Sequence, residues 1–450
     1  MVFPIIKPSI IISKTQEIIF DSVNGVCHKV PSGILKILNL IDGKRSDKDI
    51  FRELSLNYNI VKKDFNLVLS NLVKRQIIDI YQYPVTNIVN FRLPIQVVSI
   101  EITDRCNLNC RYCYGNFKSN NSVSIGFNEI AVLFKNLKRR GVKLLEITGG
   151  EPSIHPDFSK IISLACEYFE KVTIMTNGVH FNNESFNIFR QYKDKIGFSI
   201  SLDGFSESSN SFQRQTPKTF QKSLNNIIRI KKEINPQYYR IVYMLTNENI
   251  SEIDDFFESM LENDIRHLLI SIPEQIEKGR TYHLPDGCNM SDRNSLSRKI
   301  LEEKCTSLYH KYHNRVITID NSFGPDGLKI ISMLPSCGAG WRTLSFKANG
   351  DVLPCNMMDS HWVLGNFKED PDLDFLSSNN SLYNYLTQLN LSAEDGNRKL
   401  CLNCKENNFC AKCITKIFIV NQKRVKQGLG VCPFIASNKL LDLIAHIIYK

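Results

Sequence analysis

Residues 96–114 read Gln-Val-Val-Ser-Ile-Glu-Ile-Thr-Asp-Arg-Cys-Asn-Leu-Asn-Cys-Arg-Tyr-Cys-Tyr, an apolar run followed at once by three cysteines. The apolar run is rich in β-branched residues and predicts a buried strand. Cys106, Cys110 and Cys113 have the spacing C-x3-C-x2-C. Three thiolates this close can bind three irons of a cubane [4Fe–4S] cluster and leave the fourth iron open to a small molecule. Zinc is the alternative, although zinc motifs usually add a second Cys or His pair.

The composition is that of an ordinary globular protein. Of 450 residues, 42% are hydrophobic, and no apolar run is long enough to span a bilayer, so we expect no membrane partner. The first residues lack the pattern of a secretory signal, which favours a cytoplasmic protein. Fourteen cysteines in such a protein indicate metal or redox chemistry more than disulfides. The formal charge of +10 is modest for this length and predicts a solvated basic surface.

Residues 96–275 alternate strand and helix patterns, for example the amphipathic helices 127–140 and 220–233. Repeated βα units predict a parallel sheet, and six of them predict an α/β fold, a partial (β/α)6 barrel like part of a TIM barrel. Its functional loops would follow the carboxyl ends of the strands. The expected strands are 97–103, 143–148, 171–176, 197–202, 240–245 and 267–272.

Three further regions flank this expected barrel. Residues 1–85 predict a small α+β domain, and residues 276–335 a bridging region with a helix over 291–313. Residues 336–450 are dense in cysteine and end in an apolar helix over 437–449. In the first region we expect strands over 9–13, 17–20 and 25–30 and helices over 32–41, 47–57 and 63–76.

Small and polar residues end three of the expected barrel strands. Residues 148–152 read Thr-Gly-Gly-Glu-Pro, residues 176–178 Thr-Asn-Gly, and residues 199–204 Ser-Ile-Ser-Leu-Asp-Gly. Paired glycines let the backbone approach a ligand closely. Each segment alone could be a turn, and for residues 176–178 the turn is the better single interpretation. Together with the cysteines on the same rim, they predict one binding site.

These motifs resemble those of the radical S-adenosylmethionine (SAM) superfamily. The cysteine loop has an aromatic residue, Tyr112, before its third cysteine, and the Gly-Gly-Glu-Pro and Ser-Leu-Asp-Gly segments also match. The resemblance implies that Cys106, Cys110 and Cys113 hold a [4Fe–4S] cluster whose open iron binds SAM. It further implies cofactor contacts near Tyr112, at Gly149, Gly150 and Glu151 with the methionine amino end, near Ser201, and from Arg214 to the carboxylate.

The chemistry that this resemblance implies begins with an external one-electron reductant, such as flavodoxin or ferredoxin. The reduced cluster donates into the sulfonium of SAM, and the resulting 5′-deoxyadenosyl radical takes a hydrogen atom from an unactivated C–H bond. In such enzymes the cofactor supplies the difficult step, while the protein orients the substrate and excludes water.

Seven cysteines lie in the last region. The last five include two C-x2-C pairs, which could bind one zinc as a ribbon, and spacing alone gives zinc about even odds. After a radical SAM barrel, the pattern resembles the SPASM extension, which carries two auxiliary [4Fe–4S] clusters. By that resemblance Cys401, Cys404, Cys410 and Cys432 hold one cluster, and Cys337, Cys355 and Cys413 hold the other. Its fourth ligand could be Cys305 or Cys288, which are as well explained as free thiols, or the iron could be open.

The element order in residues 1–85 resembles the winged-helix domain that recognises precursor peptides in peptide-modifying enzymes. There a leader peptide would add as a strand beside residues 26–29 and pack on residues 65–74. The alternative is a DNA-binding winged helix. Its third helix would offer only Lys74 and Arg75 to a phosphate backbone, so we expect no nucleic-acid partner.

The sequence therefore predicts a cytoplasmic radical SAM enzyme that modifies a ribosomally made precursor peptide. Hydrogen abstraction and loss of an electron to the auxiliary clusters would form a C–S, C–C or C–O cross-link. A peptide epimerase or an oxidase resembling sulfatase-maturing enzymes would use similar parts. The non-enzyme alternative is a zinc-ribbon, winged-helix protein that binds nucleic acid.

Overall fold

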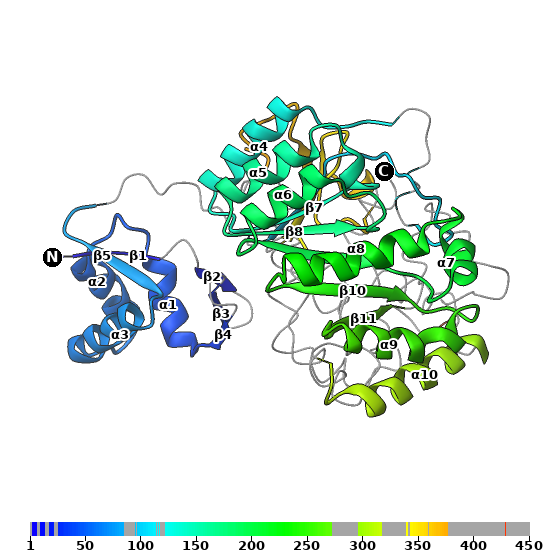
Figure 1. Ribbon diagram of the computed structural model, residues 1–450. Coiled ribbons are helices and arrows are strands. Elements are labelled where there is room, and N and C mark those ends of the chain that lie inside the picture. The colour runs from blue at the N-terminus through cyan, green and yellow to red at the C-terminus, as the bar shows by residue number, and fades with distance from the viewer. Residues whose placement is uncertain are drawn as a thin grey trace.

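The computed structural model describes residues 2–6, 10–13, 18–21, 26–84, 95, 97–113, 115, 117, 122–271, 296–316, 339–340, 343–358, 360–376 and 428. Figure 1 shows a large α/β unit and a smaller unit at the N-terminal end. The expected helix over 437–449 lies outside these ranges. Within them, no helix has both the length and the apolar character needed to cross a membrane.

A parallel sheet forms the centre of the large unit. Its six consecutive strands lie side by side in chain order, and each neighbouring pair is parallel. This confirms the α/β fold with the parallel sheet of a partial barrel. The strands are β6 (Val97–Glu101), β7 (Leu144–Thr148), β8 (Lys171–Thr176), β9 (Ile196–Ser201), β10 (Tyr239–Met244) and β11 (His267–Ser271).

Helices follow the strands and cover one face of this sheet (Figure 1). Most of the helices bury an apolar stripe against alternate strand residues such as Ile100, Ile147 and Phe198, whereas α7 buries polar side chains. The helices and short 3₁₀ turns are α4 (Phe127–Arg139), η1 (Pro152–Ile154), α5 (Phe158–Tyr168), α6 (Asn183–Gln191), α7 (Glu207–Arg214), α8 (Phe220–Glu233), η2 (Ile250–Glu252), α9 (Ile253–Glu262) and α10 (Leu296–Tyr312).

The other face of the sheet is polar because side chains alternate along each strand. Ser99 and Glu101 on β6 are buried there, beside Glu146 on β7. Burial raises the pKa of Glu146, and the nearby guanidinium of Arg240 opposes that rise. The inside of the barrel thus carries titratable and hydroxyl groups, whereas its outside is hydrocarbon.

The C-terminal region extends the same sheet, which the sequence analysis did not predict. β12 (Thr343–Phe346) pairs in parallel with β6, and β13 (Asp351–Leu353) and β14 (Gly365–Asn366) follow as antiparallel strands. The 3₁₀ turn η3 (Ser360–Trp362) joins the last two strands. The first barrel strand therefore has a barrel strand on one side and a C-terminal strand on the other.

The N-terminal unit has its own hydrophobic core, separate from that of the barrel. The predicted strands form an antiparallel sheet, and the predicted helices follow at nearly the expected residues. A second sheet, in which β1 pairs with β5, was not predicted. The elements are β1 (Phe3–Ile6), β2 (Ile10–Ser13), β3 (Ile18–Asp21), β4 (Val26–Lys29), α1 (Ser32–Leu40), α2 (Asp47–Asn57), α3 (Lys62–Lys74) and β5 (Ile78–Tyr81).

Candidate active site at the strand ends

The cysteine loop leaves the carboxyl end of β6, as the sequence predicts for a functional loop. Burial raises the pKa of Cys106 and of Cys110 to about 12, and each thiol is within electrostatic reach of the other and of Cys113. The metal-free thiols are therefore protonated at neutral pH. A bound metal reverses this, since a coordinating thiol loses its proton.

Hydrogen bonds hold the cysteine loop against the C-terminal end of α7 (Glu207–Arg214) and against the residue that follows β8. The N–H groups of Asn109 and Arg111 donate to the carbonyl oxygens of Arg214 and Gln213, at 3.1 and 3.0 Å. These carbonyls are at the C-terminal end of α7, where a helix has free acceptors. The side chain of Asn107 accepts from Asn177 Nδ2 at 2.8 Å. The loop is thus held in position by contacts within the protein.

The paired glycines after β7 bring a third segment onto the cysteine loop. The N–H of Gly150 donates to the carbonyl of Thr103 at 2.8 Å, and that of Glu151 donates to the carbonyl of Arg105 at 2.7 Å. A Cβ atom on Gly149 would lie 2.3 Å from the Thr103 oxygen, and one on Gly150 would lie 2.1 Å from the Arg105 oxygen. Only glycine permits this approach, because both obstacles are backbone atoms.

The carboxylate of Glu151 is 1% exposed and connects the ends of β7 and β8. Its Oε1 accepts from Ser153 N, Ser153 Oγ and Thr176 Oγ1 at 3.0, 2.6 and 2.7 Å. Its Oε2 accepts from the N–H of Asn177 at 2.8 Å. Most of its acceptor capacity is therefore used inside the protein, and one lone pair of Oε2 remains for the predicted ligand contact.

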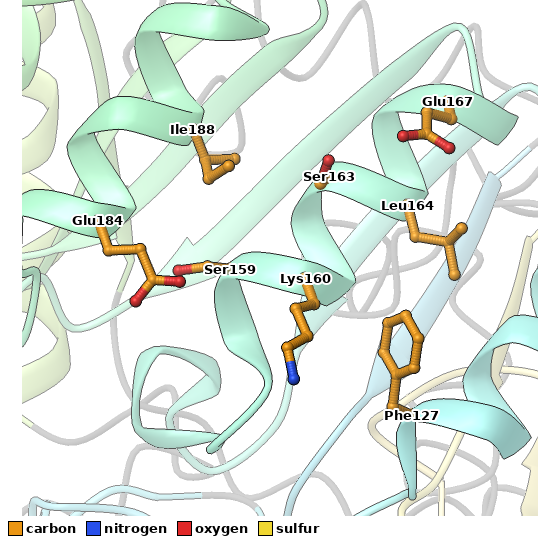
Figure 2. Close-up of a pocket in the computed structure, with 8 residues that line it drawn as sticks. All are labelled: Phe127, Ser159, Lys160, Ser163, Leu164, Glu167, Glu184 and Ile188. Atoms are coloured by element: carbon orange, nitrogen blue, oxygen red, sulfur yellow. The ribbon is translucent and has the colours of Figure 1, made fainter.

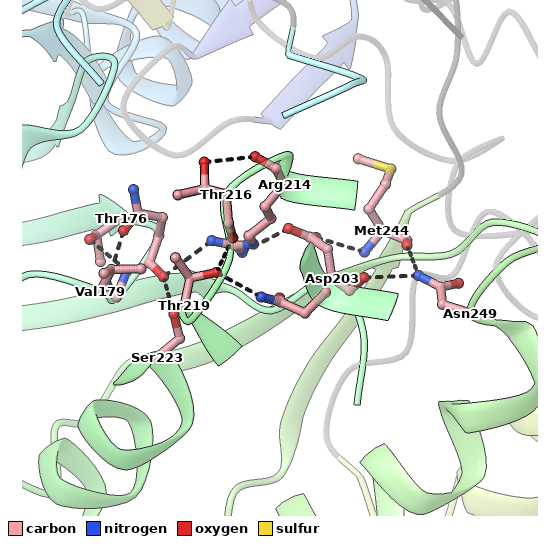
Figure 3. A network of polar contacts seen from close by, with 12 residues as sticks. Thr176, Val179, Asp203, Arg214, Thr216, Thr219, Ser223, Met244 and Asn249 are labelled. Atoms are coloured by element: carbon pink, nitrogen blue, oxygen red, sulfur yellow. Dashed lines mark hydrogen bonds and ion pairs between the residues drawn. The ribbon is translucent and has the colours of Figure 1, made fainter. Parts of the chain in front are cut away.

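A buried ion pair between Arg214 and Asp203 (Figure 3) lies within electrostatic reach of Cys110. Arg214 Nη2 is 2.7 Å from Asp203 Oδ2, and the two side chains are 1% and 2% exposed. Burial alone would lower the pKa of Arg214, but the Asp203 carboxylate outweighs it and raises that pKa. Arg214 Nε has no hydrogen-bond partner among the described residues, so it can serve a further carboxylate. That orphaned donor fits the predicted contact with SAM.

Two more predicted residues lie around this ion pair. Burial, aided by the charge of Asp203, raises the pKa of Tyr112 well above its usual value, so its hydroxyl stays neutral. Ser201 ends β9 on the same rim as the cysteines and is partly buried. The sequence analysis did not single out Asn107 and Asn177. Asn177 lies in the Thr-Asn-Gly segment, which was predicted to share the rim of the site although a turn was the better interpretation of that segment alone.

Removing one member of the buried pair should cost far more stability than removing an exposed partner. We expect Asp203→Asn to lower the free energy of unfolding of the metal-free protein by about 3 kcal/mol, because it leaves a buried guanidinium uncompensated. Glu170, which forms an exposed ion pair with Lys143, is the matched control, and Glu170→Gln should cost less than about 1 kcal/mol. Urea unfolding followed by circular dichroism measures both, and equal losses would contradict burial of the pair.

The C-terminal cysteines are described in part. Cys355 follows β13 and is partly buried, and its Sγ accepts from the N–H of Met357 at 3.5 Å. Cys305 lies in α10 within the barrel core and is 2% exposed. Cys288 lies outside the described residues. So do the other predicted auxiliary ligands, which are Cys337, Cys401, Cys404, Cys410, Cys413 and Cys432.

A groove on the outside of the barrel is a poor candidate for the active site. It has a volume of about 340 Å³ and lies over α5 and α6, and none of the predicted site residues lines it (Figure 2). Its lining residues, which include Lys160, Glu167 and Glu184, lie on helices and not at the strand ends.

The cysteine loop fits an iron–sulfur cluster better than a single metal ion. No three His, Cys, Asp or Glu side chains in the described ranges converge closely enough to hold one ion. A cubane spreads its thiolates over separate irons, so it suits three neighbouring thiols that do not meet at one point. The close-approach glycines and the orphaned Arg214 donor provide for a small ligand on the same rim.

Comparison with known families agrees with this geometry. Residues 100–260 match the radical SAM superfamily, and residues 337–413 match the SPASM iron–sulfur cluster-binding domain. The chain thus carries a radical SAM domain followed by a SPASM domain. The prediction that this is a radical SAM enzyme with a SPASM domain is confirmed. The predicted use of SAM and of iron–sulfur clusters is confirmed with it.

Relatives of this radical SAM enzyme include two proteins of Bacillus subtilis strain 168. The antilisterial bacteriocin subtilosin biosynthesis protein AlbA is 23% identical over 428 residues, which cover 90% of this chain and 88% of AlbA. The sporulation killing factor maturation protein SkfB is 24% identical over 348 residues, 75% of this chain and 74% of SkfB.

Solved structures share the fold. The crystal structure of Streptococcus suis SuiB bound to the precursor peptide SuiA has a TM-score of 0.53 at 16% identity. The match covers 93% of this chain and 97% of that one. SuiB bound to S-adenosylmethionine gives a TM-score of 0.54 at 18% identity, over 92% and 96% of the two chains.

Proposed function

We propose that this radical SAM enzyme is a maturase that forms an oxidative cross-link in a ribosomally made precursor peptide. The observation that carries this is the match over nearly the whole chain to AlbA, named for bacteriocin biosynthesis, with SkfB named for maturation of a killing factor. The hydrogen bonds that hold the cysteine loop at the strand ends support the radical step.

In this proposal Cys106, Cys110 and Cys113 hold the cluster that binds SAM. Such a cluster, reduced by a flavodoxin or ferredoxin, would give one electron to SAM. SAM would then supply a 5′-deoxyadenosyl radical that takes a hydrogen atom from the peptide. The remaining lone pair of Glu151 Oε2, beside Gly149 and Gly150, accepts from the methionine amino end, and Ser201 and Tyr112 line the site. Arg214 Nε donates to the carboxylate, while Asp203 keeps the guanidinium in place.

Cross-linking also needs an oxidant for the peptide radical. Once the hydrogen atom has left with 5′-deoxyadenosine, an auxiliary cluster held by the later cysteines would accept one electron, and a base would take one proton. The peptide thus loses two hydrogens for each C–S, C–C or C–O bond. We assign Cys337, Cys355 and Cys413 to one auxiliary cluster and Cys401, Cys404, Cys410 and Cys432 to the other.

The N-terminal unit, residues 1–85, would bind the leader of the precursor as a winged-helix-like domain. Within the described strands β4 is the edge of its sheet, since it pairs with β3 on one side. Such an edge can accept a peptide strand by β-augmentation. α3 also exposes Leu67 and Val73, which are 60% and 37% exposed and could pack on the leader. In our proposal the barrel, residues 96–275, binds the core peptide. The bridging region, residues 276–335, connects the barrel to the SPASM domain, residues 336–450, whose clusters accept the electron.

Anaerobic co-expression with a short open reading frame encoded beside this chain tests the proposal. Mass spectrometry should show a peptide lighter by two hydrogens for each bond. Solvent deuterium uptake without that loss would identify an epimerase instead. An unmodified peptide, from an enzyme that still releases 5′-deoxyadenosine, would overturn the choice of substrate. Zinc in place of iron would favour the nucleic-acid binder.

A further inference from the structure

A second buried ion pair joins the barrel to the C-terminal region. Lys347 directly follows β12, and Glu101 ends β6, its parallel neighbour. The Lys347 ammonium contacts Glu101 Oε1, and the two side chains are 13% and 4% exposed. Lys347 Nζ also donates to the carbonyl of Asn356 at 3.3 Å. A single cation therefore touches both the barrel strand and the loop after β13.

The residues that Lys347 contacts adjoin the two kinds of predicted metal site. Glu101 lies on the strand that runs into the cysteine loop at Cys106. Asn356 follows Cys355, whose Sγ is positioned by the N–H of Met357 and is the described thiol of the proposed auxiliary site. Partial burial and an N–H donor suit a thiolate ligand of an iron–sulfur cluster. The Lys347 ammonium thus contacts the residue directly after that ligand.

Burying the two charges of this pair costs desolvation free energy, and holding the two strands together does not require a charged pair. This pair resembles Arg214–Asp203 in that both of its side chains are at most 13% exposed. Desolvating two charges often costs more than their attraction returns, and apolar side chains of similar size would hold two strands as well. A charged pair at this place therefore indicates a role for its charges in the electrostatics of the nearby metal site.

We propose that Lys347 and Glu101 form a positioning pair that sets the reduction potential of the auxiliary cluster ligated by Cys355. This rests on the proposed function, in which that cluster accepts an electron from the peptide. Cluster potentials depend on nearby charge, hydrogen bonding and exposure. In a poorly screened interior, the Lys347 charge favours the more reduced, more negative cluster, and Glu101 offsets that preference.

The lead test is Glu101→Gln in the cluster-loaded, full-length enzyme. Glutamine keeps the shape and an acceptor oxygen for Lys347 but removes the compensating charge. We expect the potential of the auxiliary cluster to shift upward. The double variant Glu101→Gln with Lys347→Met is neutral again and should return the potential close to its wild-type value. Potentiometric titration followed by electron paramagnetic resonance gives the shift, read from signals that added SAM does not change.

Asp254→Asn is the matched control, because it removes an acid from an ion-pair cluster with Lys304 and Lys311 between α9 and α10. That variant should leave the auxiliary potential unchanged. A purely structural pair would give no upward shift in Glu101→Gln, or the same shift in the double variant, and either result overturns the inference. Iron in excess of one cluster per chain must be present in all variants. If it is absent from the wild-type enzyme, the auxiliary-cluster part of the proposed function fails instead.

Discussion

Replacing Cys110 by alanine is expected to abolish SAM cleavage and leave the precursor peptide unmodified. Burial raises the pKa of Cys110 to about 12, so this thiol lies in the protein interior, where an exogenous thiol cannot easily replace it. Two ligands would leave two irons of a cubane without protein thiolate. Release of 5′-deoxyadenosine under reducing conditions measures the first effect, and peptide mass spectrometry the second.

Cys166→Ala is the matched control, since Cys166 is a buried thiol of α5 in the barrel core, away from the strand ends. It should keep its iron and its SAM cleavage and lose at most a little stability. Iron analysis of Cys110→Ala should show a loss of up to one cluster per chain, with auxiliary iron retained. A Cys110→Ala enzyme that still cleaves SAM at the wild-type rate would disprove the assignment of this loop.

The barrel strands were predictable because each is an apolar run whose ends are marked by turn residues. The observed strand β8 matches its predicted range, and the others differ by a residue or two at their ends. Chemistry followed from position, since parallel strands bring their carboxyl ends to one rim. Cys106, Gly150 and Arg214 are far apart in sequence, yet the loop hydrogen bonds bring their segments together.

Contacts between distant segments were not predictable in the same way. β12 is four residues long and has no pattern that names β6 as its partner, so its parallel pairing and the ion pair between Lys347 and Glu101 came only from the structure. Glu151 shows a similar limit. Its motif predicted a ligand contact, whereas the four donors around its carboxylate show that it also fixes the end of β8.

Gly150→Ala is expected to lower SAM cleavage on the order of 100-fold, because small misplacements of reacting groups have effects of this size. The added Cβ would lie 2.1 Å from the carbonyl oxygen of Arg105, a backbone atom that cannot rotate away. Relief requires the segment after β7 to move off the cysteine loop. That movement breaks the hydrogen bonds from Gly150 to Thr103 and from Glu151 to Arg105. Both the radical cluster and the methionine end of SAM would then lose their positions.

The same substitution at Gly33 separates this local clash from a general effect of alanine. A Cβ on Gly33 in α1 meets no atom within 4 Å, and alanine favours a helix by roughly 0.5–1 kcal/mol over glycine. Gly33→Ala should therefore cleave SAM as the wild type does and unfold at equal or higher urea concentration. Circular dichroism and auxiliary iron content show whether Gly150→Ala is folded. If it is folded and cleaves SAM normally, the close approach of the glycine segment to the cysteine loop is not needed for SAM cleavage.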